Sequence, residues 1–251
     1  MADMIRELTS DSLLMARKGF TYRIPGYIFM RFLVTMRMLI ILVSVKLRGS
    51  AMWDERYERD TYVYGEAPND FLAEQCKTLK LSEEPGPVLC LAEGEGRNAV
   101  HLAECGHAVT CVDLSSVGLR KARQLAEKRG VTVETVQADL AHFTPEPGHF
   151  QAVVMIFAHT PPAIRQRSLE VAREALRPGG YLILEGYTED QIGRGTGGPG
   201  NPDMMFSKQE LDAMFAQDEV LLSRETERHI LEGEFHSGDG AVVQFVARKV
   251  G

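Results

Sequence analysis

The sequence has few cysteines and no spacing typical of a metal site. Four cysteines occur among 251 residues, with neither a CxxC pair nor a zinc pattern with the seven histidines. Cys90 and Cys111 lie inside apolar runs. These features disfavour a disulfide-rich secreted scaffold and a zinc domain. We expect buried free thiols, a cytoplasmic protein and no bound metal.

Positive charge is scarce over most of the chain. The formal net charge is −7; residues 1–51 hold eight Lys/Arg against three Asp/Glu, whereas the remaining 200 residues hold 20 against 32. A nucleic-acid surface needs Lys and Arg to neutralise phosphates. The acidic main body therefore predicts no nucleic-acid partner and favours a small-molecule substrate.

An uninterrupted membrane-spanning run is also missing. Residues 26–47 are apolar, but Arg31 and Arg37 leave 38–45 as the longest uncharged piece, eight residues long. A spanning helix needs about 20, and no signal-peptide cleavage pattern stands out. We expect residues 1–51 to be a basic apolar extension and 52–251 the functional domain, with Met52 as an alternative start. A helix resting on a membrane through 26–47, or one capping the main domain, stays open.

From residue 66 onward, helical and strand patterns alternate. The patterns predict helices over 66–79, 97–105, 115–129, 163–176 and 207–216, and strands over 88–92, 108–113, 131–137, 150–157, 181–187, 219–229 and 241–249. Repeated βα units followed by a hairpin predict an α/β fold. We expect a doubly wound, mostly parallel seven-stranded sheet with an antiparallel C-terminal hairpin.

The stretch VLCLAEGEGRNAV, residues 88–100, joins the first predicted strand to a helix through two glycines. GEGRNA at 94–99 fits the pattern G-x-G-x-x-G/A, and Asp113 ends the second strand 19 residues after Gly94. In such sheets ligands bind at the carboxyl ends of the strands, where an acid accepts hydrogen bonds from ribose hydroxyls. The pattern describes a dinucleotide site, an S-adenosylmethionine site, or glycines needed only for a tight turn.

Three further features favour S-adenosylmethionine. First, Asp139, in ADL after the third strand, is placed to accept a hydrogen bond from an adenine amino group. Second, ALRPGGYLILE at 175–185 joins a helix to the fifth strand. Third, little chain remains for the substrate domain that nicotinamide enzymes need. The chain resembles the class I S-adenosylmethionine-dependent methyltransferases in the order of its motifs, which are VLCLAEGEGRN, VTCVDLS, VQADL, VVMIFAH and LRPGGYLILE. With MWDERY and YVYGEAPNDFL before it, the chain is similar to the tellurite-resistance and thiopurine (thiol) methyltransferase group over about 52–250.

The resemblance implies a Rossmann-like methyltransferase fold that binds S-adenosyl-L-methionine. Gly94 and Gly96 are expected beside its methionine part and Asp113 at the ribose. Trp53, Tyr62 and Tyr64 are expected as a cover over the sulfonium. The expected cofactor-binding set is Trp53, Tyr64, Glu93, Gly94, Glu95, Gly96, Asn98, Asp113, Leu114, Ser115, Ala138, Asp139, Leu140, Phe157 and Ala158. The chain departs from the family at Cys90, where an acid is usual, and at Ala92, where a glycine is usual.

The same resemblance implies methyl transfer by in-line displacement to a small acceptor. A soft, thiol-like nucleophile needs little help, whereas an amine or hydroxyl needs a general base. His159 is the candidate base and Tyr64 the second catalytic candidate; His236, Glu185, Tyr187 and Arg194 are weaker candidates, and the glycine-rich loop 188–206 is a candidate lid. Methylation of amines or proteins, an NAD-binding oxidoreductase and a non-catalytic cofactor-binding module remain the alternatives.

Overall fold

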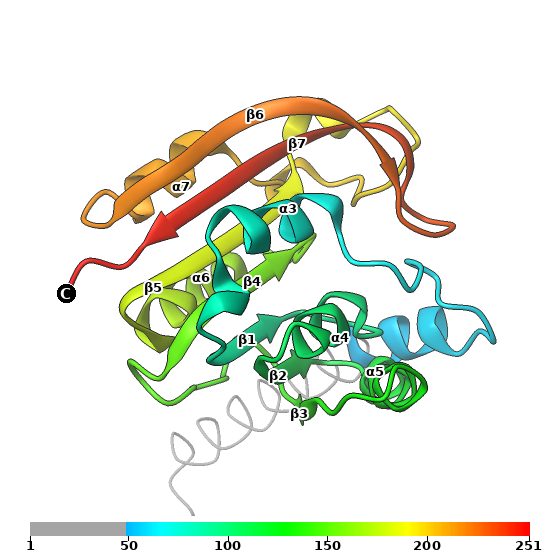
Figure 1. The fold of residues 1–251 in the computed structure, drawn as a ribbon. Helices are drawn as coiled ribbons and strands as arrows, with labels where there is room; N and C mark the ends of the chain where they lie inside the picture. The colour runs from blue at the N-terminus through cyan, green and yellow to red at the C-terminus, as the bar shows by residue number, and fades with distance from the viewer. Residues whose placement is uncertain (1–48) are drawn as a thin grey trace, which may run out of the picture. The chain divides into compact units, whose positions relative to one another are not determined.

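Seven strands form one sheet in the described part of the protein. The computed structural model describes residues 49–251 (Figure 1). The strands are β1 (Pro87–Leu91), β2 (Ala108–Asp113), β3 (Glu134–Gln137), β4 (Phe150–Ile156), β5 (Leu176–Tyr187), β6 (Glu219–Leu231) and β7 (Ser237–Arg248). Every residue of β4 is buried, as expected for a strand covered on both faces.

The strand order places a ligand-binding edge near β1 and β4. The order is β3-β2-β1-β4-β5-β7-β6. The first five strands along the sheet pair in parallel, whereas β7 is antiparallel to β5 and to β6. Figure 1 shows β6 and β7 as a long paired ribbon at one edge. The predicted fold class is confirmed, and the order reverses at β1, where open α/β sheets bind ligands.

Helices cover both faces of this sheet. They are α3 (Asp70–Thr78), α4 (Arg97–Glu104), α5 (Ser116–Lys128), α6 (Pro162–Ala175) and α7 (Lys208–Met214), with 3₁₀ turns η1 (Leu81–Glu83), η2 (Glu189–Gln191) and η3 (Pro202–Met204). Apolar side chains of α3, α4 and α5 pack in the core on one face. Those of α6 and α7 pack in the core on the other.

The start of α3 differs from the expected one. The sequence pattern predicts a helix from residue 66, but the helix begins at Asp70. Asn69 is extended and its side chain accepts a hydrogen bond from the Leu72 N–H, so an asparagine cap sets the start. Ser115 caps α5 in the same way, because its hydroxyl accepts from the Gly118 N–H.

The predicted N-terminal extension lies outside the described residues, apart from residues 49–51. A helix covers residues 49–57 and crosses the predicted boundary at 51/52. The apolar stretch 26–47 is not among the described residues, and within 49–251 no helix is both long and apolar enough to cross a bilayer. All four cysteines are free, and Cys90 and Cys111 are buried as expected.

Candidate active site at the carboxyl ends of the strands

The loop after β1 turns through three residues in the left-handed region. The φ angles are 53° at Ala92, 63° at Gly94 and 89° at Gly96. Ala92 occupies the position where the resemblance expects a glycine, so the turn forms without it. A left-handed conformation costs a non-glycine residue about 1–2 kcal/mol, which the surrounding packing must offset.

Both loop glycines have packing neighbours that the sequence did not reveal. A Cβ at Gly96 would lie 2.4 Å from the Ala122 Cβ on α5, and a Cβ at Gly94 would lie 2.6 Å from the Tyr57 hydroxyl. Both distances are far below contact distance. Close packing therefore explains the two glycines in part, and their spacing alone does not identify a ligand.

Asp113 places a buried carboxylate at the end of β2. It is 7% exposed; Oδ2 accepts from the Gly94 N–H at 2.8 Å and Oδ1 from the Ser115 N–H at 2.8 Å. Burial raises its pKa to about 6. Each carboxylate oxygen can accept a further hydrogen bond. Asp113 thus ties the glycine loop to β2 and still offers acceptors to a ligand hydroxyl.

Glu93 has one carboxylate oxygen committed to α4 and one uncommitted. Oε1 accepts from the N–H groups of Asn98 at 2.9 Å and Ala99 at 2.8 Å, which caps the start of the helix. Within residues 49–251, Oε2 has no hydrogen-bond partner. Burial raises the Glu93 pKa to about 7. A desolvated carboxylate of this kind is suited to pair with a ligand cation.

Glu95 has a structural role that the sequence did not indicate. Its side chain is 3% exposed, pairs with Lys121 at 2.5 Å and accepts from the Val63 N–H at 2.8 Å. Lys121 also donates to the backbone oxygens of Tyr57, Arg59 and Thr61. The pair holds the segment 57–63 against the glycine loop, so the Glu95 carboxylate is engaged within the protein.

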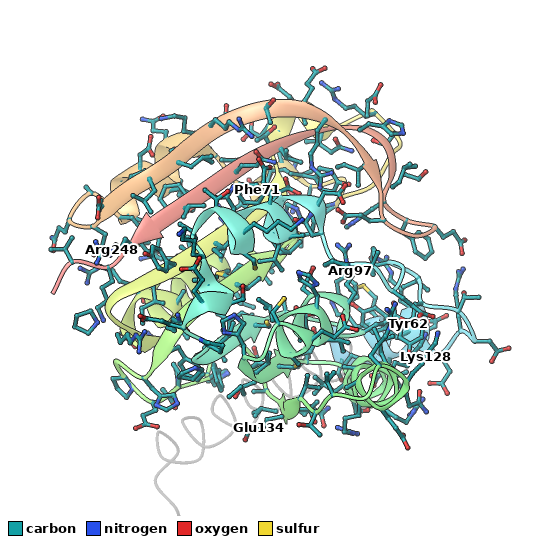
Figure 2. The ribbon with its side chains drawn as sticks, viewed as in Figure 1. Tyr62, Phe71, Arg97, Lys128, Glu134 and Arg248 are labelled. Atoms are coloured by element: carbon teal, nitrogen blue, oxygen red, sulfur yellow. The ribbon has the colours of Figure 1, made fainter. Side chains whose placement is uncertain are left out.

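The N-terminal aromatic residues divide between two places. Trp53 stacks on Tyr57 at 5.7 Å, and Tyr57 meets the edge of Tyr64 at 6.3 Å. Tyr62 instead lies beside α5, as Figure 2 shows. The centroid of its ring is 4.8 Å from the Lys121 ammonium. Tyr57 was missed, although its spacing of four from Trp53 puts both on one helix face.

Four rings from separate segments meet beyond β4 and β5, and we call them the aromatic cluster: Tyr64, Phe157, Tyr187 and His236. Ring centroids are 4.6 Å apart for Tyr64 and His236, 4.5 Å for Phe157 and His236, and 4.6 Å for Phe157 and Tyr187. Phe157 has φ 52°, an uncommon conformation for a bulky residue. The cluster unites two predicted site residues with two weaker candidates.

His159 lies beside this cluster but has both ring nitrogens occupied. Nδ1 donates to the Met204 carbonyl oxygen, 2.9 Å away, and Nε2 accepts from the Tyr187 N–H at 3.0 Å. Burial lowers its pKa to about 4. The geometry therefore argues against the predicted role of His159 as a general base and gives it the role of a buried connector.

Replacing His159 by Ala should lower the free energy of unfolding by about 1–3 kcal/mol, because the Tyr187 N–H loses its buried acceptor. Urea denaturation measures this change. His149→Ala is the control, since that exposed ring contacts Glu146 at only 3.5 Å. If the His159→Ala protein were as stable as the wild type but turned over substrate more slowly, this prediction would be contradicted and His159 would again be the candidate general base.

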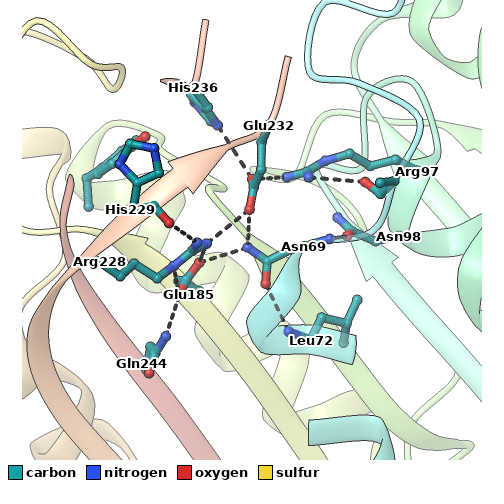
Figure 3. A network of polar contacts seen from close by, with 12 residues as sticks. Asn69, Leu72, Arg97, Asn98, Glu185, Arg228, His229, Glu232, His236 and Gln244 are labelled. Atoms are coloured by element: carbon teal, nitrogen blue, oxygen red, sulfur yellow. Dashed lines mark hydrogen bonds and ion pairs between the residues drawn. The ribbon is translucent and has the colours of Figure 1, made fainter. Parts of the chain in front are cut away.

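A buried polar network centred on Glu185 lies next to the site (Figure 3). Glu185 is 0% exposed; it accepts from Arg228 at 2.5 and 3.0 Å, from the Asn69 amide at 2.8 Å and from the Gln244 amide at 2.6 Å. Its carboxylate is thus engaged by three partners. Glu185 joins the start of α3 to the two C-terminal strands.

Glu232 extends the network to the glycine-loop helix. It accepts from Arg97 at 2.5 Å, Arg228 at 3.0 Å and Asn69 at 2.9 Å. Figure 3 shows Arg97 and Arg228 approaching Glu232 from different sides. The network therefore links α3, α4 and β5 to the turn between β6 and β7.

His236 is the imidazole that the structure brings into the aromatic cluster beside Glu232. The residue is 7% exposed, and its Nδ1 lies 4.0 Å from Glu232 Oε2 without a hydrogen-bond partner in the described part of the chain. Burial lowers its pKa. Sequence reasoning gave it little weight, because the path of a hairpin connection is not encoded in a local pattern.

The remaining predicted residues frame the site or stabilise its surroundings. Asn98 Oδ1 accepts from the Asn69 N–H at 2.9 Å, and Asp139 Oδ1 accepts from the Ala141 N–H at 3.0 Å. Leu140 and Ala158 are buried in the core, whereas Leu114 and Ala138 are partly exposed. Arg194 pairs with Glu227 at 2.6 Å on an exposed surface, outside the aromatic cluster.

The candidate lid, residues 188–206, is tied to the C-terminal hairpin. Gln191 Oε1 accepts from the Ala241 N–H at 2.9 Å, and its amide donates to the Gly197 carbonyl oxygen at 3.0 Å. Thr196 donates to the Asp239 carbonyl oxygen at 2.9 Å. Its closure over a ligand stays a prediction, for which changed hydrogen exchange on ligand binding is the measurement.

These groups fit S-adenosylmethionine. The remaining acceptor capacity of Asp113 suits ribose hydroxyls, and the uncommitted Glu93 oxygen suits an ammonium group. Aromatic faces attract a cation such as a sulfonium by about 0.5–2 kcal/mol. Within residues 49–251, no group of three or more His, Cys, Asp or Glu side chains is arranged to hold a metal.

Comparisons with known proteins agree with this geometry. Residues 88–180 match the family described as Methyltransferase domain. The chain is 30% identical over 145 residues to glycine/sarcosine N-methyltransferase of Halorhodospira halochloris, covering 56% of this chain and 52% of that protein. It is 35% identical over 116 residues to tRNA 5-carboxymethoxyuridine methyltransferase of Escherichia coli, covering 41% and 42%. The chain therefore spans about half the length of these curated relatives or less.

A solved structure extends the similarity beyond the matched domain. TehB of Haemophilus influenzae superposes with a TM-score of 0.59 at 18% identity, covering 80% of this chain and 66% of that one. At this identity the likeness concerns the fold. Residues 88–180 thus form a methyltransferase domain, and this match together with the sheet order supports the predicted class I S-adenosylmethionine-dependent methyltransferase.

Proposed function

We propose that this protein transfers the methyl group of S-adenosylmethionine to a small, soft nucleophile such as a thiol. The observation that carries the choice of acceptor is the aromatic cluster and its lack of a strong base. His159 is engaged on both nitrogens, and burial lowers the pKa of His236 and raises that of Tyr187. A thiol loses its proton near pH 8.5, so it needs a weaker base than an alcohol does.

Residues of this chain would bind the cofactor and orient the acceptor. When bound, the cofactor supplies a methyl carbon on a sulfonium, which is a good leaving group. Asp113 accepts from the ribose, Glu93 pairs with the ammonium, and the rings of Tyr64 and Phe157 cover the sulfonium and exclude water. The imidazole of His236, whose Nδ1 faces the Glu232 carboxylate at 4.0 Å, takes the proton of an acceptor that arrives as a thiol through its other nitrogen, Nε2. Alignment at about 3–3.5 Å then does most of the catalytic work.

Two other acceptor classes are less well supported. One relative is named for an amine substrate and another for tRNA. An amine needs deprotonation by a stronger base than the cluster offers. A tRNA acceptor needs a basic surface, whereas residues 52–251 carry 32 Asp/Glu against 20 Lys/Arg.

The test is release of S-adenosylhomocysteine from the purified protein with a panel of thiol, halide, amine and phenol acceptors. We expect thiols to react fastest. Faster amines or phenols would contradict the soft acceptor. Binding of S-adenosylhomocysteine without turnover of any acceptor would indicate a binding module, and selective binding of NADH in calorimetry would overturn the cofactor.

A further inference from the structure

A guanidinium at the edge of the aromatic cluster has no carboxylate partner. Arg56, on the helix over 49–57, lies 4.8 Å from the centroid of Trp53 and 5.3 Å from that of Phe235. Its Nη1 donates to the Tyr64 hydroxyl at 2.9 Å. In the part of the chain that the structure describes, neither Asp nor Glu pairs with it.

Arg59 lies beside the same Phe235 ring as Arg56, but its charge is neutralised by a carboxylate. The Arg59 guanidinium lies 5.0 Å from the Phe235 centroid, but it pairs with Glu234 at 2.9 Å and donates to both carboxylate oxygens. Another nearby acid, Glu58, contacts Arg120 at 3.7 Å. The positive charge of Arg56 is therefore left unbalanced beside the cluster.

The surroundings of Arg56 prepare it to bind an anion. Two rings hold the partly buried guanidinium, which lowers the entropy lost when it binds. A guanidinium has five N–H donors, and a single side-chain contact, that with Tyr64, uses one of them. The remaining donors form the planar fork that matches a carboxylate in two hydrogen bonds.

Arg56 also lies within electrostatic reach of the proposed reaction centre. It is bonded to Tyr64, whose ring is 4.6 Å from that of His236. Burial is the main cause of the lowered pKa of His236, and the charge of Arg56 adds to it. An anion bound by Arg56 would therefore lie close to the His236 imidazole, with Tyr64 between them.

We propose that Arg56 binds a carboxylate of the methyl acceptor, so that the substrates are acidic small molecules such as thiol carboxylates. This inference rests on the proposed function. The carboxylate of the cofactor is the competing occupant, but the partners of Arg56 are Trp53, Tyr64 and Phe235. Trp53 and Tyr64 are also expected near the cofactor, whereas Phe235, in the connection between β6 and β7, belongs to no expected cofactor contact and lies outside the matched domain at 88–180. Segments outside that shared domain are the ones free to differ between acceptors.

The experiment compares 2-mercaptobenzoate with 2-mercaptobenzamide, which differ in charge at nearly constant shape. Calorimetric binding to the protein loaded with S-adenosylhomocysteine and methylation kinetics are both measured. The wild-type protein should favour the benzoate about tenfold or more in Kd and in kcat/KM, because hydrogen bonds to a charged group are lost in the amide.

Arg56→Gln should abolish this preference by raising KM for the benzoate, with little change for the benzamide. Arg56→Lys, which keeps the charge without the fork, should retain part of it. Arg59→Gln is the matched control and should keep the full preference. Equal binding of the two probes to the wild-type protein, or no binding of either, would overturn the inference.

Two further outcomes separate this inference from its competitors. A weaker affinity for S-adenosylhomocysteine in Arg56→Gln, with acceptor discrimination intact, would assign Arg56 to the cofactor and overturn the inference. Charge-selective binding without methylation would support Arg56 as the anion site while contradicting the proposed function. Methylation without charge selectivity would support the proposed function and contradict Arg56 as the anion site.

Discussion

Asp113→Ala should weaken the binding of S-adenosylhomocysteine by about 1.5–3 kcal/mol, which is roughly a 10- to 150-fold rise in Kd. The substitution removes the buried acceptors proposed for the ribose hydroxyls. It also removes the hydrogen bonds, each 2.8 Å long, that the carboxylate accepts from the N–H groups of Gly94 and Ser115. The glycine loop then loses its link to β2, so the effect includes a loss of preorganisation.

Calorimetric titration of the folded variants measures this effect. Glu134→Gln, on the neighbouring strand β3, is the control, because that exposed carboxylate accepts from the Thr110 hydroxyl at 3.0 Å and lies outside the proposed contacts. It should bind the ligand as the wild-type protein does. An Asp113→Ala protein of normal affinity would show that the ribose contact is misassigned.

The second large effect concerns stability. Glu185→Ala should lower the free energy of unfolding by about 3–5 kcal/mol, because removing one member of a buried ion pair leaves an uncompensated charge. Arg228 loses two short contacts, and the Asn69 and Gln244 amides each lose an acceptor. For a domain of this size the melting temperature should fall by roughly 6–20 °C.

Urea denaturation and thermal melting report this change. Glu185→Gln keeps the volume and should also be destabilising, since it removes the charge that Arg228 meets. Glu219→Gln removes an exposed partner of Arg248 at 3.5 Å and should have little effect. A loss below about 1 kcal/mol in Glu185→Ala would mean that Glu232 alone satisfies Arg228.

By itself the sequence determined the order and type of the elements. Alternating runs of apolar residues and turn residues encode strands and helices locally, which is why β2 was expected at the residues where it lies, and β4 nearly so. The cap at Ser115 and the acid that ends β2 are local signals too. Because parallel strands end at one edge of the sheet, these signals also predicted the side of the sheet at which the cofactor binds.

Only the tertiary structure decided which side chains are available for chemistry. His159 and His236 are both histidines near turns. His159 contacts a backbone carbonyl and a backbone N–H, whereas His236 Nδ1 faces the Glu232 carboxylate at 4.0 Å without a hydrogen bond. Likewise Arg59 is neutralised by Glu234, while Arg56, three residues earlier, meets rings and a hydroxyl. These outcomes depend on contacts between residues far apart in the chain, set by packing of the hairpin and the 49–57 helix, and local sequence patterns carry no record of such contacts.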